Sequence, residues 1–316
     1  MASILDVPSI TIQNELAALN ADLDLTIPTK TNDNLLIATW NLRKFGNLTE
    51  EWVDKPNMSP KRNLHALSCI IEILKRFDII AVQEVTGNLK CLRDTMRLLG
   101  DNWSFLMTDE TKGSKGNKER LAFIFNNTKA KLSGLACEIV IPDEELAKGT
   151  IKADALTRQF ARTPYAVSFK VKNKTFVLLT LHVLFGDHPE DRRPEIIEIA
   201  EWIKDWALKL GKWGHSLIIL GDFNIDRRKD ENFKAFISTG LYIPQELIDA
   251  SRSVFNKMAF YDQIAWYQKK FNLSYVSGGN YDFTASAMSS LNITKKDLSY
   301  RISDHFPLFV EYRLTP

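Results

Sequence analysis

Four short apolar segments that each end on a polar side chain limit the fold of this chain more than any other feature of its sequence. They occupy residues 35–41, 78–84, 176–182 and 216–224. Uninterrupted apolar runs of this length are typical of strands that are buried on both faces. The polar side chains at or near their ends are Asn41, Glu84, His182, Asp222 and Asn224. A side chain in that position has a fixed backbone and lies at the edge of the core, so the pattern predicts a functional site built on strand ends.

A fifth segment near the end of the chain repeats the pattern, because Asp304 and His305 directly precede the apolar run 306–310. Apolar residues recur at helical spacing in three stretches, at 61–77, 89–99 and 190–210. In the first of these we expect Lys61 and Arg62 to lie on the outer face. Strand-like segments also pair across short links, as at 165–171 and 176–182, which favours hairpins. Helices that alternate with strands, some of them in hairpins, predict an α/β fold with mixed sheets.

Residues 1–33 carry little pattern and end in a turn-rich stretch at 27–34. A short helix at 12–19 and a mobile segment are both consistent with this composition. No linker separates the strand ends that follow. We therefore expect one domain at 34–316 that carries the site, preceded by an N-terminal extension at 1–33.

The composition excludes several classes of protein. The net charge of the 316 residues is +2, so phosphate binding requires local cations or a metal rather than a strong overall field. Cys69, Cys91 and Cys137 are an odd number without a paired motif, which argues against a disulfide framework or a structural zinc site. The sequence contains no secretory signal pattern and no segment long enough to span a bilayer. We therefore expect a cytoplasmic protein with no membrane segment.

The oxygen-bearing side chains at the strand ends suit a hard divalent cation such as Mg²⁺, which takes one or two carboxylates and keeps several waters. Glu84 and Asp304 are the candidate carboxylate ligands, and Asn41 offers an amide oxygen. Asp222 and Asn224 stand two positions apart, on the same face of an extended segment. We expect Asp222 to orient or deprotonate an attacking water and Asn224 to donate a hydrogen bond to a phosphate oxygen.

His182 and His305 are the candidate acid–base groups, because imidazole titrates near neutral pH. Each works best beside a carboxylate that fixes its tautomer, and Glu119 and Asp262 are the candidates by position. A salt link to an adjacent basic residue is the alternative role for Glu119, and a turn cap is the alternative for Asp262.

Together these residues resemble the endonuclease/exonuclease/phosphatase superfamily, the metal-dependent phosphoesterases related to pancreatic deoxyribonuclease I. The matching motifs occur in family order over residues 36–310, nearly the whole chain apart from the lead-in. They are Thr-Trp-Asn-Leu-Arg-Lys-Phe-Gly at 39–46, Val-Gln-Glu-Val at 82–85, Lys-Glu-Arg-Leu-Ala-Phe at 118–123, Arg-Thr-Pro at 162–164, Thr-Leu-His at 180–182, Gly-Asp-Phe-Asn at 221–224, Tyr-Asp-Gln-Ile at 261–264 and Ser-Asp-His-Phe-Pro at 303–307.

The resemblance implies a four-layer α/β/β/α sandwich, with two packed mixed sheets flanked by helices and the site at one end between the sheets. It also implies hydrolysis of a phosphodiester by an in-line water, with Mg²⁺ or Mn²⁺ bound by Glu84. The residues that match the family's site are His182 with Glu119, His305 with Asp262, Asp222 and Asn224 for water and phosphate, Asn41 and Asp304 beside the metal, Arg162 for phosphate and Arg43 for nucleic acid.

Departures from the deoxyribonuclease pattern narrow the expected substrate. Thr86 stands where deoxyribonuclease I has a minor-groove arginine, and the essential disulfide of that enzyme has no counterpart here. Both differences argue against a secreted, general duplex-cutting nuclease. The inositol-phosphatase signature is absent around Asp262. Arg158 is a second candidate for the phosphate-contacting arginine, although the proline at 164 favours Arg162.

The resemblance favours a phosphodiesterase that acts on nucleic acid, with a DNA endonuclease as the first hypothesis. A phosphatase or phospholipase-type enzyme that acts on a small headgroup is the alternative within the enzyme class. A catalytically silent binding module with the same fold is the alternative outside it. The complete set of polar strand ends argues against the silent module, because burying polar groups costs free energy that a binding module has no reason to spend.

Overall fold

The computed structural model describes residues 2–111, 117–139, 162–212, 214–250, 253–255, 259–269 and 271–314. Its strands form two sheets. The first has the order β10-β11-β1-β2-β4-β3 and contains β1 (Asn34–Phe45), β2 (Ile79–Val85), β3 (Trp103–Met107), β4 (Arg120–Asn126), β10 (Ser274–Asn280) and β11 (Leu308–Arg313). The second has the order β5-β6-β7-β8-β9 and contains β5 (Lys131–Glu138), β6 (Tyr165–Val171), β7 (Lys174–His182), β8 (Ser216–Asp222) and β9 (Asp262–Trp266).

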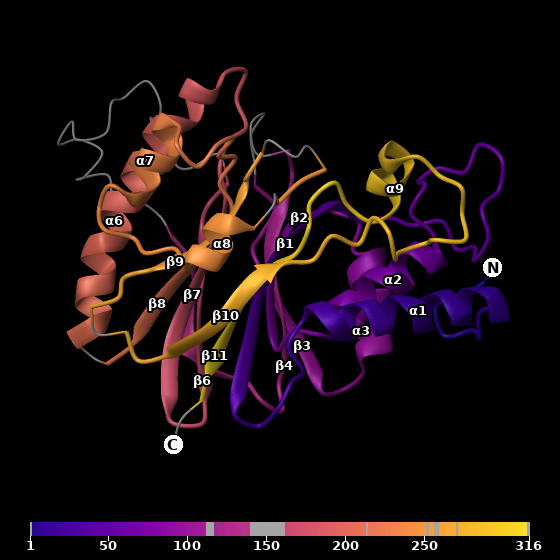
Figure 1. Cartoon of the computed structure of the whole chain (residues 1–316), viewed down its shortest axis with the longest axis horizontal. Helices are drawn as coiled ribbons and strands as arrows, with labels where there is room; N and C mark the ends of the chain where they lie inside the picture. Colours follow the sequence, from indigo (N-terminus) through magenta and orange to yellow (C-terminus); the bar gives the residue numbers. More distant parts are fainter. Residues whose placement is uncertain are drawn as a thin grey trace.

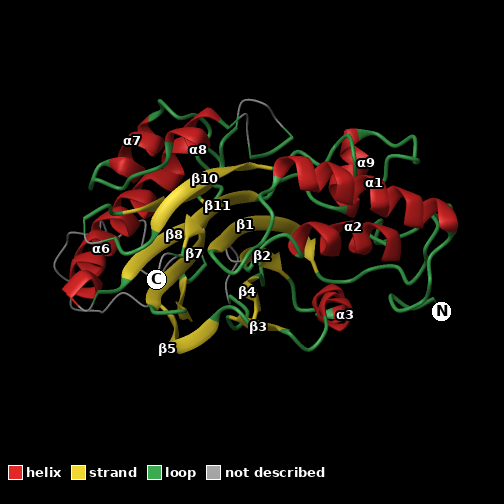
Figure 2. Cartoon of the chain, turned by 60° about the horizontal axis from the view of Figure 1, so that its bottom comes forward, coloured by secondary structure: helices red, strands yellow, loops and turns green. Residues whose placement is uncertain are grey.

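Helices cover the outer faces of the two packed sheets, as Figures 1 and 2 show. On the side of the first sheet lie α1 (Ile10–Thr26), α2 (Leu64–Leu74), α3 (Lys90–Leu99) and α9 (Lys295–Arg301). On the side of the second lie η1 (Pro189–Arg192), α6 (Arg193–Lys212), α7 (Glu231–Ile237) and α8 (Gln245–Asp249). The pairs β1–β2 and β7–β8 are parallel and the others are antiparallel. The predicted four-layer sandwich with mixed sheets is therefore confirmed.

The apolar side chains of β1 contribute to two cores, one between the sheets and one under the helices. Successive side chains of a strand point to opposite faces. Leu35 and Ile37 belong to the core between the sheets, whereas Leu36, Ala38 and Trp40 belong to the core under α1 and α2. The strand is consequently buried on both faces, and the polar residues at odd positions beyond Ile37 face the second sheet.

One strand of the first sheet and one residue near it differ from the sequence prediction. Strand β10 (Ser274–Asn280) was not predicted, because its polar and glycine-rich sequence carries no apolar alternation. It gains its conformation from antiparallel pairing with β11. Arg62, expected on the outer face of a helix at 61–77, instead precedes α2 and is buried, with 3% of its surface exposed.

The N-terminal region is a packed helix rather than a mobile segment. Helix α1 is longer than the short helix considered at 12–19 and begins after Ser9, whose side chain accepts a hydrogen bond from the backbone N–H of Ile12. Leu19 and Leu23 are fully buried in the same core as α2. No helix in the described part of the chain is both long and apolar enough to cross a bilayer.

The packing of α1 predicts the cost of weakening it. We expect Leu23→Ala to lower the free energy of unfolding by about 2–5 kcal/mol, because it removes a fully buried side chain and leaves a cavity. Leu25, two residues away, is 88% exposed, so Leu25→Ala should change stability by less than about 0.5 kcal/mol. Urea unfolding of the two variants measures the difference, and equal stabilities would show that α1 does not contribute to the core.

Candidate active site

The polar strand ends meet at one end of the sandwich because the strands that carry them are neighbours. In the second sheet, His182 is paired with Asp222 across β7 and β8, and Asp222 is paired with Asp262 across β8 and β9. In the first sheet, Asn41 is paired with Gln83 across β1 and β2. Strands β1 and β2 also contact β8 in the opposite sheet.

One atom, Oδ2 of Asp222, lies at the centre of this group. It accepts a hydrogen bond from Nδ2 of Asn41 at 3.0 Å, across the space between the sheets. Nε2 of His182 lies 3.5 Å from the same oxygen, and Nε2 of His305 lies 3.8 Å from it. All four side chains are buried. The structure thus brings together residues from positions 41 to 305 around one carboxylate.

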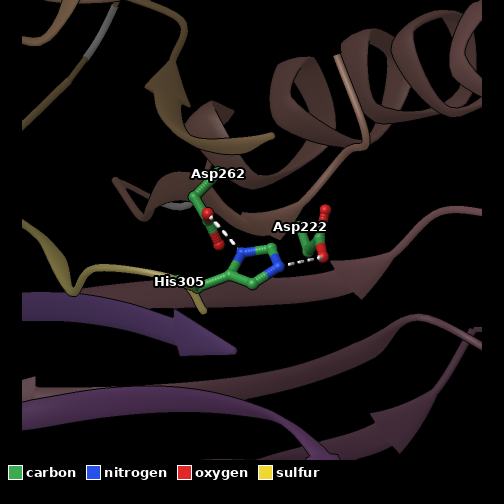
Figure 3. Close-up of side chains that lie close together, drawn as sticks. All are labelled: Asp222, Asp262 and His305. Atoms are coloured by element: carbon green, nitrogen blue, oxygen red, sulfur yellow. Dashed lines mark hydrogen bonds and ion pairs between the residues drawn. The ribbon is translucent and has the colours of Figure 1, made fainter. Parts of the chain in front are cut away.

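His305 lies between two carboxylates (Figure 3). Its Nδ1 is 2.8 Å from Oδ2 of Asp262, and its Nε2 faces Asp222. Asp262 is held in turn by Ser253, whose hydroxyl accepts a hydrogen bond from the backbone N–H of Asp262. Burial alone would lower the pKa of His305, but the charges of Asp262 and Asp222 outweigh it and raise this pKa to about 10. His305 is therefore a cation at neutral pH.

His182 has its own carboxylate partner. Its Nδ1 lies 3.3 Å from Oε2 of Glu119, and the same oxygen accepts a hydrogen bond of 2.5 Å from Nε of Arg162. Burial would raise the pKa of Glu119, but His182 and Arg162 outweigh it and lower this pKa below its usual range. The predicted pairing of Glu119 with His182 is thus present in the structure, and Arg162 joins it. Arg158 lies outside the described residues.

The central carboxylate is stabilised as an anion. Burial would raise the pKa of Asp222, but the charges of His305 and His182 lower it below its usual range, helped by hydrogen bonds from Asn41 and from the backbone N–H of Asn224. The latter bond runs to Oδ1 at 3.0 Å. Oδ1 and Oδ2 therefore each accept a hydrogen bond, so the orientation of the carboxylate is fixed.

The Gly-Asp-Phe-Asn turn is shaped by backbone requirements. Gly221 has φ +149°, and a Cβ there would collide with the carbonyl oxygen of Leu181 in the adjacent strand. Asn224 has φ +52°, and its Nδ2 donates to the carbonyl oxygen of Val183 at 2.7 Å. The amide of Asn224 thus ties this turn to the end of β7 and has a second N–H that can donate to another acceptor.

The candidate metal ligands Glu84 and Asp304 both contact the 41–44 segment. Oε1 of Glu84 accepts from Nδ2 of Asn41 and Oε2 accepts from the backbone N–H of Lys44, each at 2.9 Å. Oδ2 of Asp304 lies 3.1 Å from Nη1 of Arg43, and the Asp304 side chain is 40% exposed. Glu84 also has φ +62°, a conformation that the surrounding bonds must hold.

These residues fit a hard cation. The carboxylates of Glu84 and Asp304 are both partly exposed and carry the oxygen ligands that Mg²⁺ takes together with waters and a substrate phosphate. The amide oxygen of Asn41 accepts from the backbone N–H of Arg43 at 2.9 Å, so Asn41 faces Glu84 with its nitrogen and orients this carboxylate.

A second group with metal-ligating atoms consists of Asp222, Asp262 and His305, whose ligand atoms lie within 4.8 Å of one another. The His305–Asp262 hydrogen bond already occupies one ligand atom of each residue. Within this buried group His305 lies against both carboxylates, so the imidazole itself can balance their charge. We therefore interpret this group as an acid–base network.

Two residues that the sequence interpretation did not include support the site. Gln83 is fully buried, and its Nε2 donates to Thr180 at 2.9 Å and to Thr39 at 3.1 Å, so it joins the two sheets directly behind Glu84. Gln83 alternates with Ile79 and Ala81 on the same face of β2. Strand alternation in the sequence could therefore have predicted that its side chain faces the second sheet.

Arg62 is the second supporting residue. Its guanidinium donates to five carbonyl oxygens, those of Leu42, Arg43, Lys44, Arg301 and Ile302, at 2.7–3.1 Å. These bonds tie the end of β1 to the segment that precedes Asp304 and His305. Only the assembled structure identifies this role, because no local pattern distinguishes Arg62 from a surface arginine.

Comparison with known proteins identifies the family of this chain. The chain matches the Endonuclease/Exonuclease/phosphatase family over residues 38–288. It is 24% identical to a deoxyribonuclease of Thioalkalivibrio sp. (strain K90mix), over 91% of this chain and 73% of that protein. It is 26% identical to deoxyribonuclease gamma of Rattus norvegicus, over 89% of this chain and 84% of that protein.

Solved structures show the same fold. A mannosyl-6-phosphatase of Bacteroides thetaiotaomicron superposes with a TM-score of 0.57 at 18% identity, over 88% of this chain and 99% of that one. The family match covers most of the chain and includes Asn41, Glu84, His182 and Asp222. The chain therefore belongs to the endonuclease/exonuclease/phosphatase family of phosphoesterases, with the fold of deoxyribonuclease I.

Proposed function

We propose that this protein is a metal-dependent phosphodiesterase that cleaves nucleic acid, and that DNA is its substrate. The observation that carries the proposal is the convergence of two histidine–carboxylate pairs on Asp222, beside the carboxylate of Glu84. This arrangement supplies an anion for the nucleophilic water and cations for the phosphate, as in-line hydrolysis of a phosphodiester requires.

In this mechanism the attacking water binds next to Asp222. The pKa of this carboxylate is lowered, so it is ionised at neutral pH and accepts a hydrogen bond from the water. Asn41 and Asn224 hold the carboxylate in place, so little reorganisation is needed when the water attacks. Asn224 directs its remaining amide N–H to a phosphate oxygen.

The charge that develops on the phosphate is met by fixed donors. His305 is positively charged beside Asp262, and His182 is oriented by Glu119. Arg162 donates from Nε to Glu119 and from Nη1 to the carbonyl oxygen of His182, which leaves Nη2 for the phosphate. In a buried site such donors each contribute about 10²–10³-fold to the rate.

Glu84 and Asp304 would hold Mg²⁺ or Mn²⁺, with Asn41 orienting Glu84; when bound, the cation neutralises phosphate charge and polarises the phosphorus–oxygen bond. Arg43 lies next to Asp304, and its guanidinium would contact the nucleic acid.

Two deoxyribonucleases that align with about nine-tenths of this chain support a nucleic-acid substrate. The phosphatase that shares the fold supports a second candidate, a phosphoesterase for a small headgroup. Free thiols at Cys69, Cys91 and Cys137 suit a reducing compartment, which supports the proposed cytoplasmic location.

Single substitutions test the two halves of the site, the candidate metal ligands and the candidate acid–base groups. We expect Glu84→Ala and His182→Ala each to lower kcat for phosphodiester hydrolysis by at least about 100-fold, because they remove a metal ligand and an acid–base group. Steady-state kinetics in Mg²⁺ and in Mn²⁺ measure the loss, with Glu201→Ala on the exposed face of α6 as control. Circular dichroism checks that both site variants are folded, and full activity in either would refute the assignment.

Activity on a plasmid and on a sugar monophosphate distinguishes a nuclease from a headgroup phosphoesterase. With Mg²⁺ or Mn²⁺ we expect the protein to nick supercoiled plasmid and to release no inorganic phosphate from a sugar monophosphate such as mannose 6-phosphate. Removal of the metal with EDTA should abolish nicking, and readdition should restore it. Phosphate release without nicking would favour the headgroup phosphoesterase.

A further inference from the structure

A hollow of about 260 Å³ lies beside the candidate metal ligands, outside the catalytic group described above. It is lined by Arg43, Lys44, Asn47, Pro60, Lys61 and Tyr300, with Arg62 beneath. Its volume is slightly below that of a typical small-molecule pocket, so it accepts one chemical group, such as a nucleotide, rather than a duplex. Two of its residues connect it directly to the metal site.

These connections run through consecutive residues of one backbone turn. Nη1 of Arg43 contacts Asp304, and the backbone N–H of Lys44 contacts Glu84. Both residues have positive φ, +38° and +50°. Arg62 donates to their carbonyl oxygens at 3.0 and 3.1 Å, which holds the turn rigid. A group in the hollow therefore sits at a fixed place relative to the candidate metal ligands.

The lining of the hollow combines cations with an exposed aromatic ring. Tyr300 is 44% exposed, with the guanidinium of Arg43 at 4.1 Å from the ring centroid and Nζ of Lys61 at 5.9 Å. Interleaved cations and aromatic rings are the usual means of binding a single nucleic-acid strand, since cations contact phosphates and rings contact bases.

The acidic groups near the hollow do not prevent its lysines from binding an anion. Lys61 pairs with Asp297, but the side chains are 46% and 32% exposed, and exposed pairs of this kind are weak. The side chain of Lys44 is exposed, and no hydrogen bond or ion pair of its ammonium group occurs among the described residues. A phosphate can therefore engage both lysines.

We propose that this hollow binds the nucleotide adjacent to the scissile phosphate in a nucleic-acid strand, with Lys44 and Lys61 on its phosphate and Tyr300 against its base. The inference rests on the proposed nuclease function and adds the element that makes the enzyme selective for a polymer. A small headgroup has no neighbouring nucleotide and gains nothing from this surface.

The salt dependence of cleavage tests the two lysines. We expect Lys44→Gln and Lys61→Gln each to reduce the slope of log(kcat/KM) against log[salt] by about 0.7 for a single-stranded oligonucleotide, because each removes one phosphate contact. Lys174→Gln is the matched control, since Lys174 lies at the opposite end of β7 from His182. Unchanged slopes in both lysine variants would overturn the proposal.

The aromatic contact is tested by comparing a polymer with a substrate that lacks a neighbouring nucleotide. Tyr300→Ala should reduce the ratio of kcat/KM for the oligonucleotide to that for bis(p-nitrophenyl) phosphate at least about fivefold, and Tyr300→Phe, which keeps the ring, should retain it. An unchanged ratio in folded Tyr300→Ala overturns the proposed base contact. If the unaltered protein hydrolyses the ester but no oligonucleotide, the nuclease function itself fails, and that outcome differs from a failure of the hollow alone.

Discussion

The buried hydrogen bond between Asn41 and Asp222 is the interaction on which the rest of the site depends. It joins the two sheets at the end where the strands stop, and the same amide nitrogen also holds Glu84. A carboxylate as buried as Asp222 is costly unless it is paired, and His182 and His305 supply the pairing. The interactions that stabilise this charge are therefore the same ones that fix the orientation of the carboxylate.

Supporting residues explain how the strand ends stay in register. Gly221 lets the end of β8 approach β7 closely, because any Cβ would meet the Leu181 carbonyl. Gln83 connects the sheets behind the site through Thr39 and Thr180. Arg62 ties the metal-side turn to the segment before Asp304. The candidate acid–base groups and the candidate metal ligands are thus held by separate networks that meet at Asn41.

The sequence predicted most of the strand ends well, because their signal is local, although β1 continues past Asn41 to Phe45. A continuous apolar run followed by a polar residue identified Asn41, Glu84 and His182 without knowledge of the fold. Strand β10 was missed, since it depends on pairing with β11 rather than on its own polar sequence. Arg62 was misplaced, because a buried guanidinium that bonds to backbone carbonyls leaves no pattern in neighbouring residues.

By itself the sequence determined which chemical groups stand at the ends of buried strands, since alternation and apolar runs follow from the geometry of each strand alone. Only the tertiary structure decided which of these ends meet. Asn41 reaches Asp222 across 181 positions of sequence because two sheets pack face to face. It also decided that Arg162 joins Glu119 and that Tyr300 borders a basic hollow, because such contacts depend on the packing of the whole core.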